Sequence, residues 1–191
     1  MTSGKLRVWG LPPRTFFFHE DTELVSSLLF LFVIIAAAFI WSWSVPALTI
    51  RQLPGNRVVY QIPMHTDGKF KLIYIHSIHR TPVEERYHIN AERKIVVDAV
   101  VFDTYGVGMP SSLAEGETLR LENGKMITEN MNRVVGTFDL RIGQVIANHT
   151  LYVNDKVIPL SQISAPGSAV RFEVDRLNLF TYLRGVLRHG G

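Results

Sequence analysis

Cysteine is absent from the sequence. Without it, the chain can form no disulfide bond, no iron–sulfur cluster and no zinc site with thiolate ligands. Any folded domain must therefore be held together by its hydrophobic core. The 191 residues are enough for one domain of about 100–150 residues with additional segments.

Long runs of Lys or Arg are also missing, although the formal net charge is +3. Because nucleic-acid-binding proteins concentrate basic residues on one face or in one segment, we expect no nucleic-acid partner. The signatures GxSxG and HExxH do not occur, and no Ser, His and Asp stand in a context that supports a catalytic triad. The sequence thus indicates no enzymatic activity and no cofactor.

Charge is missing altogether between Glu23 and Arg51. Within this stretch Leu24–Val45 is almost entirely apolar, and as a helix it would extend roughly 33 Å, close to the hydrocarbon thickness of a bilayer. Tryptophans near its end are typical of a membrane interface. We therefore predict a single transmembrane anchor over 24–45, ended by Pro46.

This segment has two other interpretations. A buried core helix is disfavoured, because such long uncharged runs seldom occur inside a small domain. A cleaved signal peptide would have a shorter apolar region and a small-x-small site. Three basic residues precede the span and two follow it closely, a small bias in the same direction as the short leader and the large domain that follows. Together they favour a cytoplasmic leader over 1–23 and an extracytoplasmic main domain in the cell membrane.

After Pro46 the continuous apolar pattern changes to alternation with frequent turn signals. Asn-Gly in ENGK (122–125) is a strong hairpin signal, VNDK (153–156) is a weaker one and TDGK (66–69) is a third turn. Residues 46–173 are therefore predicted to form an all-β domain, a sandwich or open barrel of short antiparallel strands. The predicted strands are 48–52, 57–63, 69–78, 83–90, 94–104, 117–122, 125–129, 134–142, 149–153, 156–160 and 169–174.

The end of the chain, 174–191, departs from this alternation. Apolar residues over 174–188 recur at helical spacing with arginines around them, which predicts a C-terminal amphipathic helix. Such a helix could lie on the membrane surface or on a partner, or pack on the sheet of its own domain.

The stretch YIHSIHRTPVEERYHI, 74–89, has the pattern of a hairpin. A turn at Arg80-Thr81 would place His76 opposite Glu85 on the more apolar face. A carboxylate on such a face must be paired, hydrogen-bonded or protonated. The favoured interpretation is a structural His–Glu pair. A binding or proton-handling site is a second, and a metal site of His76, Glu85 and His149 is a third.

The stretch YGVGMP, 105–110, is the other distinctive feature. Gly106 and Gly108 permit positive φ and close backbone approach, and Pro110 restricts the exit. Because GxGxxG and a following helix are lacking, this is not a nucleotide-binding loop. It is interpreted either as a bulge or tight loop, or as a loop that faces a ligand or partner.

Three segments, YIHSIHRTPVEERY, FDTYGVGMP and GTFDLRIGQVIANHTLYV, resemble a bacterial family of domains of unknown function. The resemblance covers roughly 57–160. The genes of this family commonly lie beside those of the permease and substrate-binding protein of TAXI-type TRAP transporters. The residues that carry it are His76, Ser77, Pro82, Val83, Glu85, Gly106, Gly108 and the region around His149.

The resemblance implies a membrane-anchored accessory subunit for secondary uptake of organic anions, which contacts the permease outside the membrane, with the substrate-binding protein as a second candidate partner. The alternative is a free-standing anchored module that binds a small ligand or a metal. The candidate ligand- or partner-binding residues are His76, Ser77, Glu85, Gly106, Gly108, Pro110 and His149.

Overall fold

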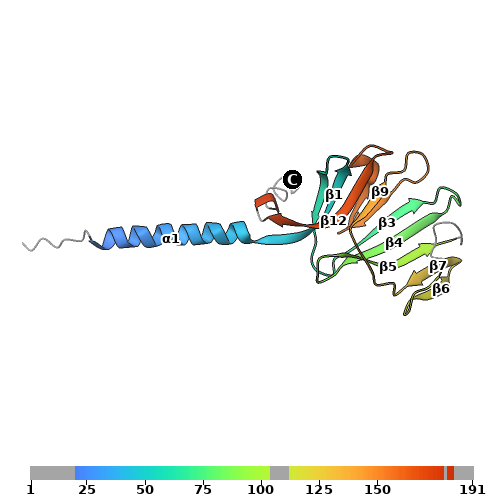
Figure 1. The fold of residues 1–191 in the computed structure, drawn as a ribbon, viewed down its shortest axis with the longest axis horizontal. Helices are drawn as coiled ribbons and strands as arrows, with labels where there is room; N and C mark the ends of the chain where they lie inside the picture. Colours follow the sequence, from blue (N-terminus) through green and yellow to red (C-terminus); the bar gives the residue numbers. More distant parts are fainter. Residues whose placement is uncertain (1–19, 104–111, 179, 183–191) are drawn as a thin grey trace, which may run out of the picture. The chain divides into compact units, whose positions relative to one another are not determined.

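The computed structural model describes residues 20–103, 112–178 and 180–182 and divides the chain into two compact units, Met1–Ser42 and Trp43–Gly191. The described part of the first unit is one helix, α1 (Glu20–Ser42) (Figure 1). Its segment Glu23–Ile40 has a mean hydropathy of 2.5 and none of it is buried within the protein. It has the length and composition of a membrane-spanning helix, properties that it shares with signal sequences.

The helix ends earlier than predicted. It stops at Ser42, whose hydroxyl donates a hydrogen bond to the Phe39 carbonyl (2.9 Å), and strand β1 (Ser44–Leu53) begins two residues later. Pro46 therefore lies within a strand and does not terminate the helix. Proline is tolerated there because pairing with β2 begins only at Ala47, so no ladder bond to that strand needs its missing N–H.

The second unit is a sandwich of two mostly antiparallel sheets, as predicted (Figure 1). The smaller sheet has four strands in the order β2-β1-β12-β9, and the larger has eight, in the order β11-β10-β3-β4-β5-β7-β6 with β8 also pairing with β5. The remaining strands are β2 (Arg57–Pro63), β3 (Lys69–Ile75), β4 (Pro82–Ile89), β5 (Ile95–Phe102), β6 (Thr118–Glu122), β7 (Lys125–Glu129), β8 (Arg133–Gly136), β9 (Phe138–Arg141), β10 (Thr150–Val153), β11 (Lys156–Pro159) and β12 (Ala169–Asn178).

Both predicted two-residue hairpins are present. Asn123 and Gly124 have φ of 51° and 75° and join β6 to β7, and Asn154 and Asp155 have φ of 45° and 60° and join β10 to β11. Positive φ at both central residues is the type I′ geometry that matches the twist of paired strands. The turn near Asp67 instead carries the chain from the smaller sheet to the larger.

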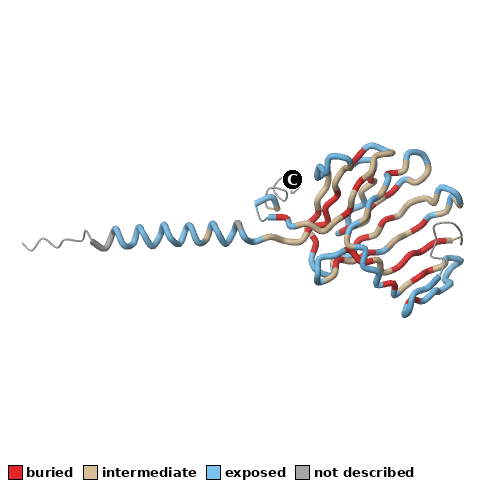
Figure 2. Tube along the Cα trace, in the orientation of Figure 1, coloured by how far each residue is buried: buried red, intermediate tan, exposed pale blue. Residues whose placement is uncertain are grey.

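The core lies between the two sheets. Buried residues, red in Figure 2, recur along the strands of both sheets. An aromatic stack crosses it: ring centroids are 4.9 Å apart for Phe172 and Phe138, 5.3 Å for Phe138 and Tyr87, and 4.9 Å for Tyr87 and Phe70. Each such contact contributes about 0.5–1.5 kcal/mol beyond burial. The stack joins β12 and β9 of the smaller sheet to β4 and β3 of the larger.

Strand β5 contains a bulge opposite β4. Tyr87 pairs with Val97 and Arg86 pairs with Ala99, so Asp98 is the extra residue. Its carbonyl accepts a hydrogen bond from the Met131 amide (3.0 Å). At the same place the neighbour of β5 changes from β8 to β7, which leaves room for the irregularity.

The C-terminal segment differs from its prediction. β12 extends to Asn178 and is fully paired with β1, so residues 174–178 form a strand where a helix was expected. A short helix follows at 180–182. The Asn178 side chain accepts a hydrogen bond from the Thr181 amide (2.8 Å), the interaction of a helix N-cap. The rest of the predicted amphipathic helix lies outside the described residues.

Candidate functional site

The hairpin β3–β4 forms, but its register differs from the predicted one. Tyr74 pairs with Val83, and Leu72 pairs with Glu85, so His76 is not opposite Glu85. The strands are joined by a loop over 76–81, closed by a hydrogen bond from the His76 amide to the Thr81 carbonyl (2.9 Å). The predicted turn at Arg80-Thr81 was wrong because Thr is unsuited to positive φ and only Arg80 adopts it, at 55°.

His76 organises this loop. Its Nδ1 atom accepts hydrogen bonds from the amides of Ile78 (3.3 Å) and His79 (3.2 Å), and its ring stacks on that of His79 with centroids 4.8 Å apart. Ser77 and Ile78 are exposed at the tip. Two apparent ligand candidates thus take different roles: the imidazole shapes the loop, and Ser77 faces solvent.

Glu85 points to the inner, more apolar face, as expected, but its partners are tyrosines. Tyr87 donates a hydrogen bond to Oε2 (2.6 Å) and Tyr74 donates one to Oε1 (3.1 Å). Burial, and then the Glu85 charge, raise the pKa of both phenols well above 10.0. Both hydroxyls therefore stay protonated and serve as donors, which satisfies the carboxylate without a cation.

His149 is buried beside the same group. Its ring is tilted against that of Tyr74, with centroids 4.9 Å apart, and its Nδ1 accepts a hydrogen bond from the Gly143 amide (3.3 Å). Burial lowers the pKa of His149, and a hydrogen bond with the backbone of Ala147 opposes this effect only in part. The structure thus brings His149 close to Glu85 through Tyr74, whereas His76 stays in its loop.

The remaining sequence candidates do not extend this group. In the described ranges 20–103, 112–178 and 180–182, no three His, Asp or Glu side chains are placed to hold a metal ion, so the alternative metal site of His76, Glu85 and His149 is not formed there. Gly106, Gly108 and Pro110 lie outside the described residues.

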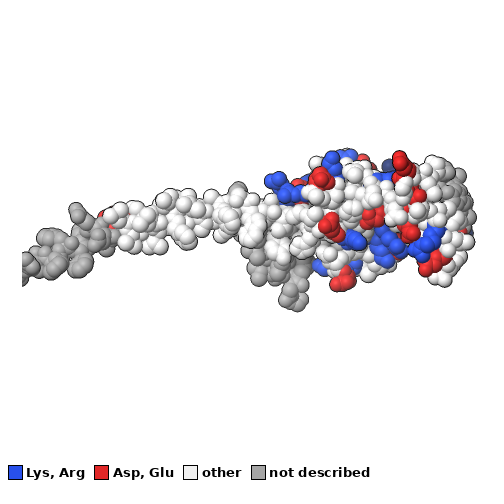
Figure 3. Space-filling model, turned by 90° about the horizontal axis from the view of Figure 1, so that it is seen from below, with Lys and Arg blue, Asp and Glu red and all other residues white. Residues whose placement is uncertain are grey.

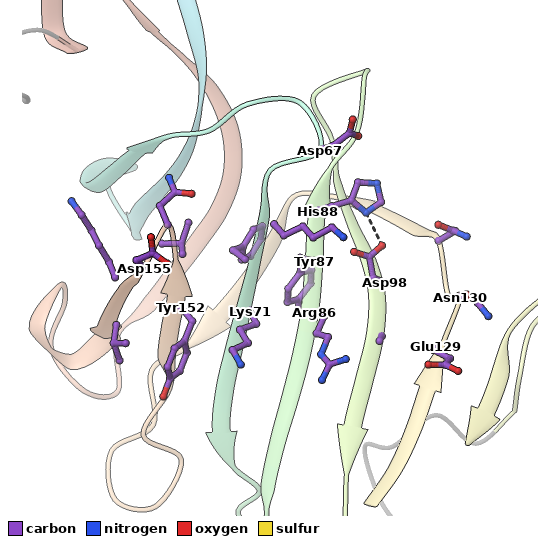
Figure 4. Close-up of a pocket in the computed structure, with 18 residues that line it drawn as sticks. Asp67, Lys71, Arg86, Tyr87, His88, Asp98, Glu129, Asn130, Tyr152 and Asp155 are labelled. Atoms are coloured by element: carbon purple, nitrogen blue, oxygen red, sulfur yellow. Dashed lines mark hydrogen bonds and ion pairs between the residues drawn. The ribbon is translucent and has the colours of Figure 1, made fainter. Parts of the chain in front are cut away.

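A cleft lies on the opposite, outer face of the larger sheet, and sequence reasoning did not single it out. Its volume is ≈ 910 Å³, within the range typical of small-molecule sites. Figure 4 shows the side chains that line it, which come from β3, β4, β5, β7, β10 and β11 and from the turns around them. The charged side chains among them are Asp67, Lys69, Lys71, Arg86, His88, Asp98, Glu129, Asp155 and Lys156.

One row of directly paired residues crosses the cleft. Val157 pairs with Tyr152, Tyr152 with Lys71, Lys71 with Arg86, and Arg86 with Ala99. Because paired residues share a face, all five lie on the outer side of the sheet. Figure 4 shows Tyr152, Lys71 and Arg86 in this order across it. A second, smaller hollow of ≈ 360 Å³ also has Arg86 in its lining.

Glu84 holds the two cations of this row together. Its carboxylate accepts a hydrogen bond from Arg86 Nε (2.7 Å) and another from Lys71 Nζ (3.1 Å). Burial alone would raise the pKa of Glu84, but the bonds from Arg86 and Lys71 outweigh it and the pKa is lowered from 4.5. Lys71 Nζ also lies 5.2 Å from the centre of the Tyr152 ring, a cation–π contact.

The bulge in β5 adds a second polar pair to the cleft. Asp98 Oδ1 lies 2.6 Å from Nδ1 of His88 (Figure 4), and His88 pairs with Lys69 across the strands. On the face of the β-domain that Figure 3 shows, acidic and basic side chains are interspersed, whereas Leu24–Ser42 contains no charged residue. The cleft is therefore distinguished by the arrangement of its charges.

The alternation of the hairpin sequence contained a signal for this face. Four polar side chains of the hairpin fall on the face opposite Glu85 in the predicted register and in any register that differs from it by an even number of residues. They are Lys71, Glu84, Arg86 and His88. Only the observed register places Lys71 opposite Arg86. The contribution of Tyr152 and Asp98 depends on strand order and on a bulge, neither of which local patterns reveal.

The comparisons with known proteins identify a domain but no activity. Residues 70–160 match the model of the family described as "Domain of unknown function (DUF1850)". The protein contains a DUF1850 domain. This match covers β3 to β11, and so includes Glu85, His149 and most of the outer cleft. No curated protein and no solved structure matches the chain.

Proposed function

We propose that this protein is a membrane-anchored accessory subunit of a TAXI-type TRAP transporter for organic anions, acting through protein–protein contact outside the membrane. The transporter setting comes from the sequence resemblance described above, and the DUF1850 match agrees with its domain-level part. In this proposal the permease is the main partner and the substrate-binding protein a possible second one.

The observation that carries the proposal is the apolar helix joined to the β-domain with a single residue between α1 and β1. Used as an anchor, α1 would keep the β-domain at the membrane, where a permease is available at high effective concentration. The basic residues that precede the span favour a cytoplasmic N-terminus, and the β-domain would then face the extracytoplasmic side.

The loop over 76–81 supplies a surface suited to a partner. Ile78 at its tip is 64% exposed, and the surrounding backbone is held by the His76 hydrogen bonds. An apolar side chain on a pre-organised loop can bury area on a partner with little loss of conformational entropy. We therefore assign His76 a positioning role and Ser77 and Ile78 contact roles.

Co-purification from the native host tests the accessory role. The tagged full-length protein, extracted in mild detergent, should recover the TRAP permease by mass spectrometry. Ile78→Asp should reduce that recovery several-fold, while Val145→Asp, at a valine that is 92% exposed in another loop, should not. Deletion of residues 46–191 should abolish uptake. Recovery of the protein alone at good yield, or unchanged uptake after the deletion, would reject the proposal.

The outer cleft favours a second candidate function, a membrane-anchored module that binds a small ligand. A cleft of ≈ 910 Å³ with paired charges and an aromatic wall is suited to an organic molecule. A ligand that binds the folded state alone raises the unfolding temperature. Thermal unfolding of the full-length protein with small organic acids, amides and divalent metals therefore tests this function.

A further inference from the structure

The central feature of the outer cleft is a pair of like charges. Lys71 and Arg86 lie directly opposite each other on β3 and β4. Like charges in this position destabilise a sheet unless another charge compensates them. Two cations placed side by side at the floor of an open cleft therefore indicate a site for an anion.

Glu84 compensates only part of this charge. Lys71 and Arg86 contribute two positive charges and Glu84 one negative charge, so the three groups together carry one positive charge. Glu84 is largely covered, with 20% of its side chain exposed, whereas 49% of the Arg86 side chain is exposed. Within the part of the chain that the structure describes, Arg86 uses only Nε for hydrogen bonding, and its two terminal nitrogens have no partner.

The same row provides a place for an apolar group. On one side of the cations lie the ring of Tyr152 and the side chain of Val157, which is 60% exposed. On the other side lies Ala99, which pairs with Arg86 and lines the cleft with a single methyl group. A ligand with one anionic end and a short hydrocarbon body would therefore match the row from Arg86 to Val157.

We propose that the outer cleft binds a small organic carboxylate, with its carboxylate group between Arg86 and Lys71 and its hydrocarbon part against Tyr152 and Val157. The planar guanidinium matches the two oxygens of a carboxylate. A phosphate group, with a charge near −2, exceeds the net single positive charge of Lys71, Arg86 and Glu84, and the carboxylates of Glu129 and Asp155 also line the cleft. This inference rests on the second candidate function and gives that function a ligand class.

Binding of benzoate to the full-length protein in non-ionic detergent tests the proposal, with benzamide as its neutral counterpart. Calorimetry should give a saturable affinity for benzoate, with benzamide and inorganic phosphate at least tenfold weaker. Backbone amide shifts in NMR spectra should locate benzoate at Lys71, Arg86 and Tyr152. Arg86→Gln and Lys71→Gln should each weaken benzoate binding at least tenfold, and Arg86→Lys should retain part of it.

Arg171→Gln is the matched control. Arg171 lies on the other sheet, where its Nε and one terminal nitrogen donate to Asp139 (2.7 and 2.9 Å), and its loss should leave the benzoate affinity unchanged. Circular dichroism would verify that each variant is folded. If Arg86→Gln does not fold, the benzoate affinity of Arg86→Lys tests the role of Arg86 in its place.

Four results would overturn the carboxylate assignment: equal binding of benzamide, tighter binding of phosphate, amide shifts confined to other surfaces, or benzoate affinity unaffected at Arg86 and Lys71. If neutral probes bind in the cleft, a ligand-binding module remains and only its ligand class is wrong. If no probe binds at millimolar concentration, both the ligand class and the second candidate function fail. The accessory role is decided separately by co-purification.

Discussion

The inner and outer faces of the larger sheet hold two adjacent carboxylates in different ways. Glu85 points inward and is bound by the hydroxyls of Tyr74 and Tyr87, whereas Glu84 points outward and is bound by Lys71 and Arg86. Consecutive residues of a strand necessarily face opposite sides. The different partners therefore reflect the different solvent access of the two faces.

The comparison separates a closed arrangement from an open one. Each oxygen of Glu85 accepts a bond from a phenol that stays protonated, so the inner group is complete within the domain. On the outer face the two cations exceed their carboxylate by one charge, and the Arg86 terminal nitrogens have no partner within the described ranges. We interpret the inner group as part of the fold and the outer one as a binding surface.

The largest expected difference between the faces concerns their tyrosines. Tyr87→Phe removes the 2.6 Å hydrogen bond to Glu85 and leaves a half-buried carboxylate short of a donor, so the free energy of unfolding should fall by about 1–3 kcal/mol. Tyr152→Phe, on the outer face of the same sheet, should change it by less than about 0.5 kcal/mol. Urea unfolding at pH 7 measures both.

Equal losses in the two variants would contradict the distinction between the faces. Tyr74→Phe provides an intermediate case, because its bond to Glu85 is longer, at 3.1 Å, and Tyr74 is less buried than Tyr87. Its loss of stability should therefore lie between those of the other two variants.

His149 predicts a pH dependence that belongs to the inner face. Its folded pKa is lowered below 6.5 by burial, so the unfolded chain takes up a proton first as the pH falls. Its contribution to stability is therefore complete above pH 6.5 and decreases below it, at a slope of at most about 1.4 kcal/mol per pH unit.

The variant His149→Asn can retain an acceptor for the Gly143 amide without titrating near neutrality. Between pH 7.5 and 5.5 the wild-type protein should lose more stability than this variant, by at most about 1.4 kcal/mol. Urea midpoints at the two pH values give the difference. An identical pH dependence would show that His149 is equally protonated in the folded and unfolded states.

Much of the fold could be predicted because it depends on local patterns. Alternation and turn chemistry located nearly every strand, and the Asn-Gly signal at 123–124 predicted a hairpin with the observed backbone conformation. The need of Glu85 for a partner also followed from its place in the alternation. These features share one property, since neighbouring residues alone determine them.

The candidate site depended on long-range pairing and was predicted only in part. The loop over 76–81 is longer than a two-residue turn, so the strand register differs from the predicted one. Glu85 is therefore bound by tyrosines and not by His76. Strand β10 beside β3 brings Tyr152 to Lys71, and the bulge at Asp98 depends on which strands meet β5. No local pattern encodes those neighbours.

A small effect is also expected from the loss of Glu84 on the outer face. Its folded pKa lies below 4.5, so its contribution is present above that pH and disappears as the pH falls through the folded value. Ion pairs at a protein surface contribute about 0–1 kcal/mol, and because Lys71 and Arg86 are both partly exposed, Glu84→Gln should cost an amount in that range at pH 7. The difference from wild type should shrink toward pH 3 and also at high salt, which screens the repulsion between Lys71 and Arg86.

A measured loss for Glu84→Gln as large as that for Tyr87→Phe would mean that the outer charges hold the sheet together, as the inner tyrosines do. A small loss, combined with an altered affinity for benzoate, would instead separate the two faces by role. The sheet would then owe little stability to Lys71 and Arg86, and their direct opposition would be explained by the anion that they receive. Unfolding and binding measured on one variant thus decide between these two interpretations.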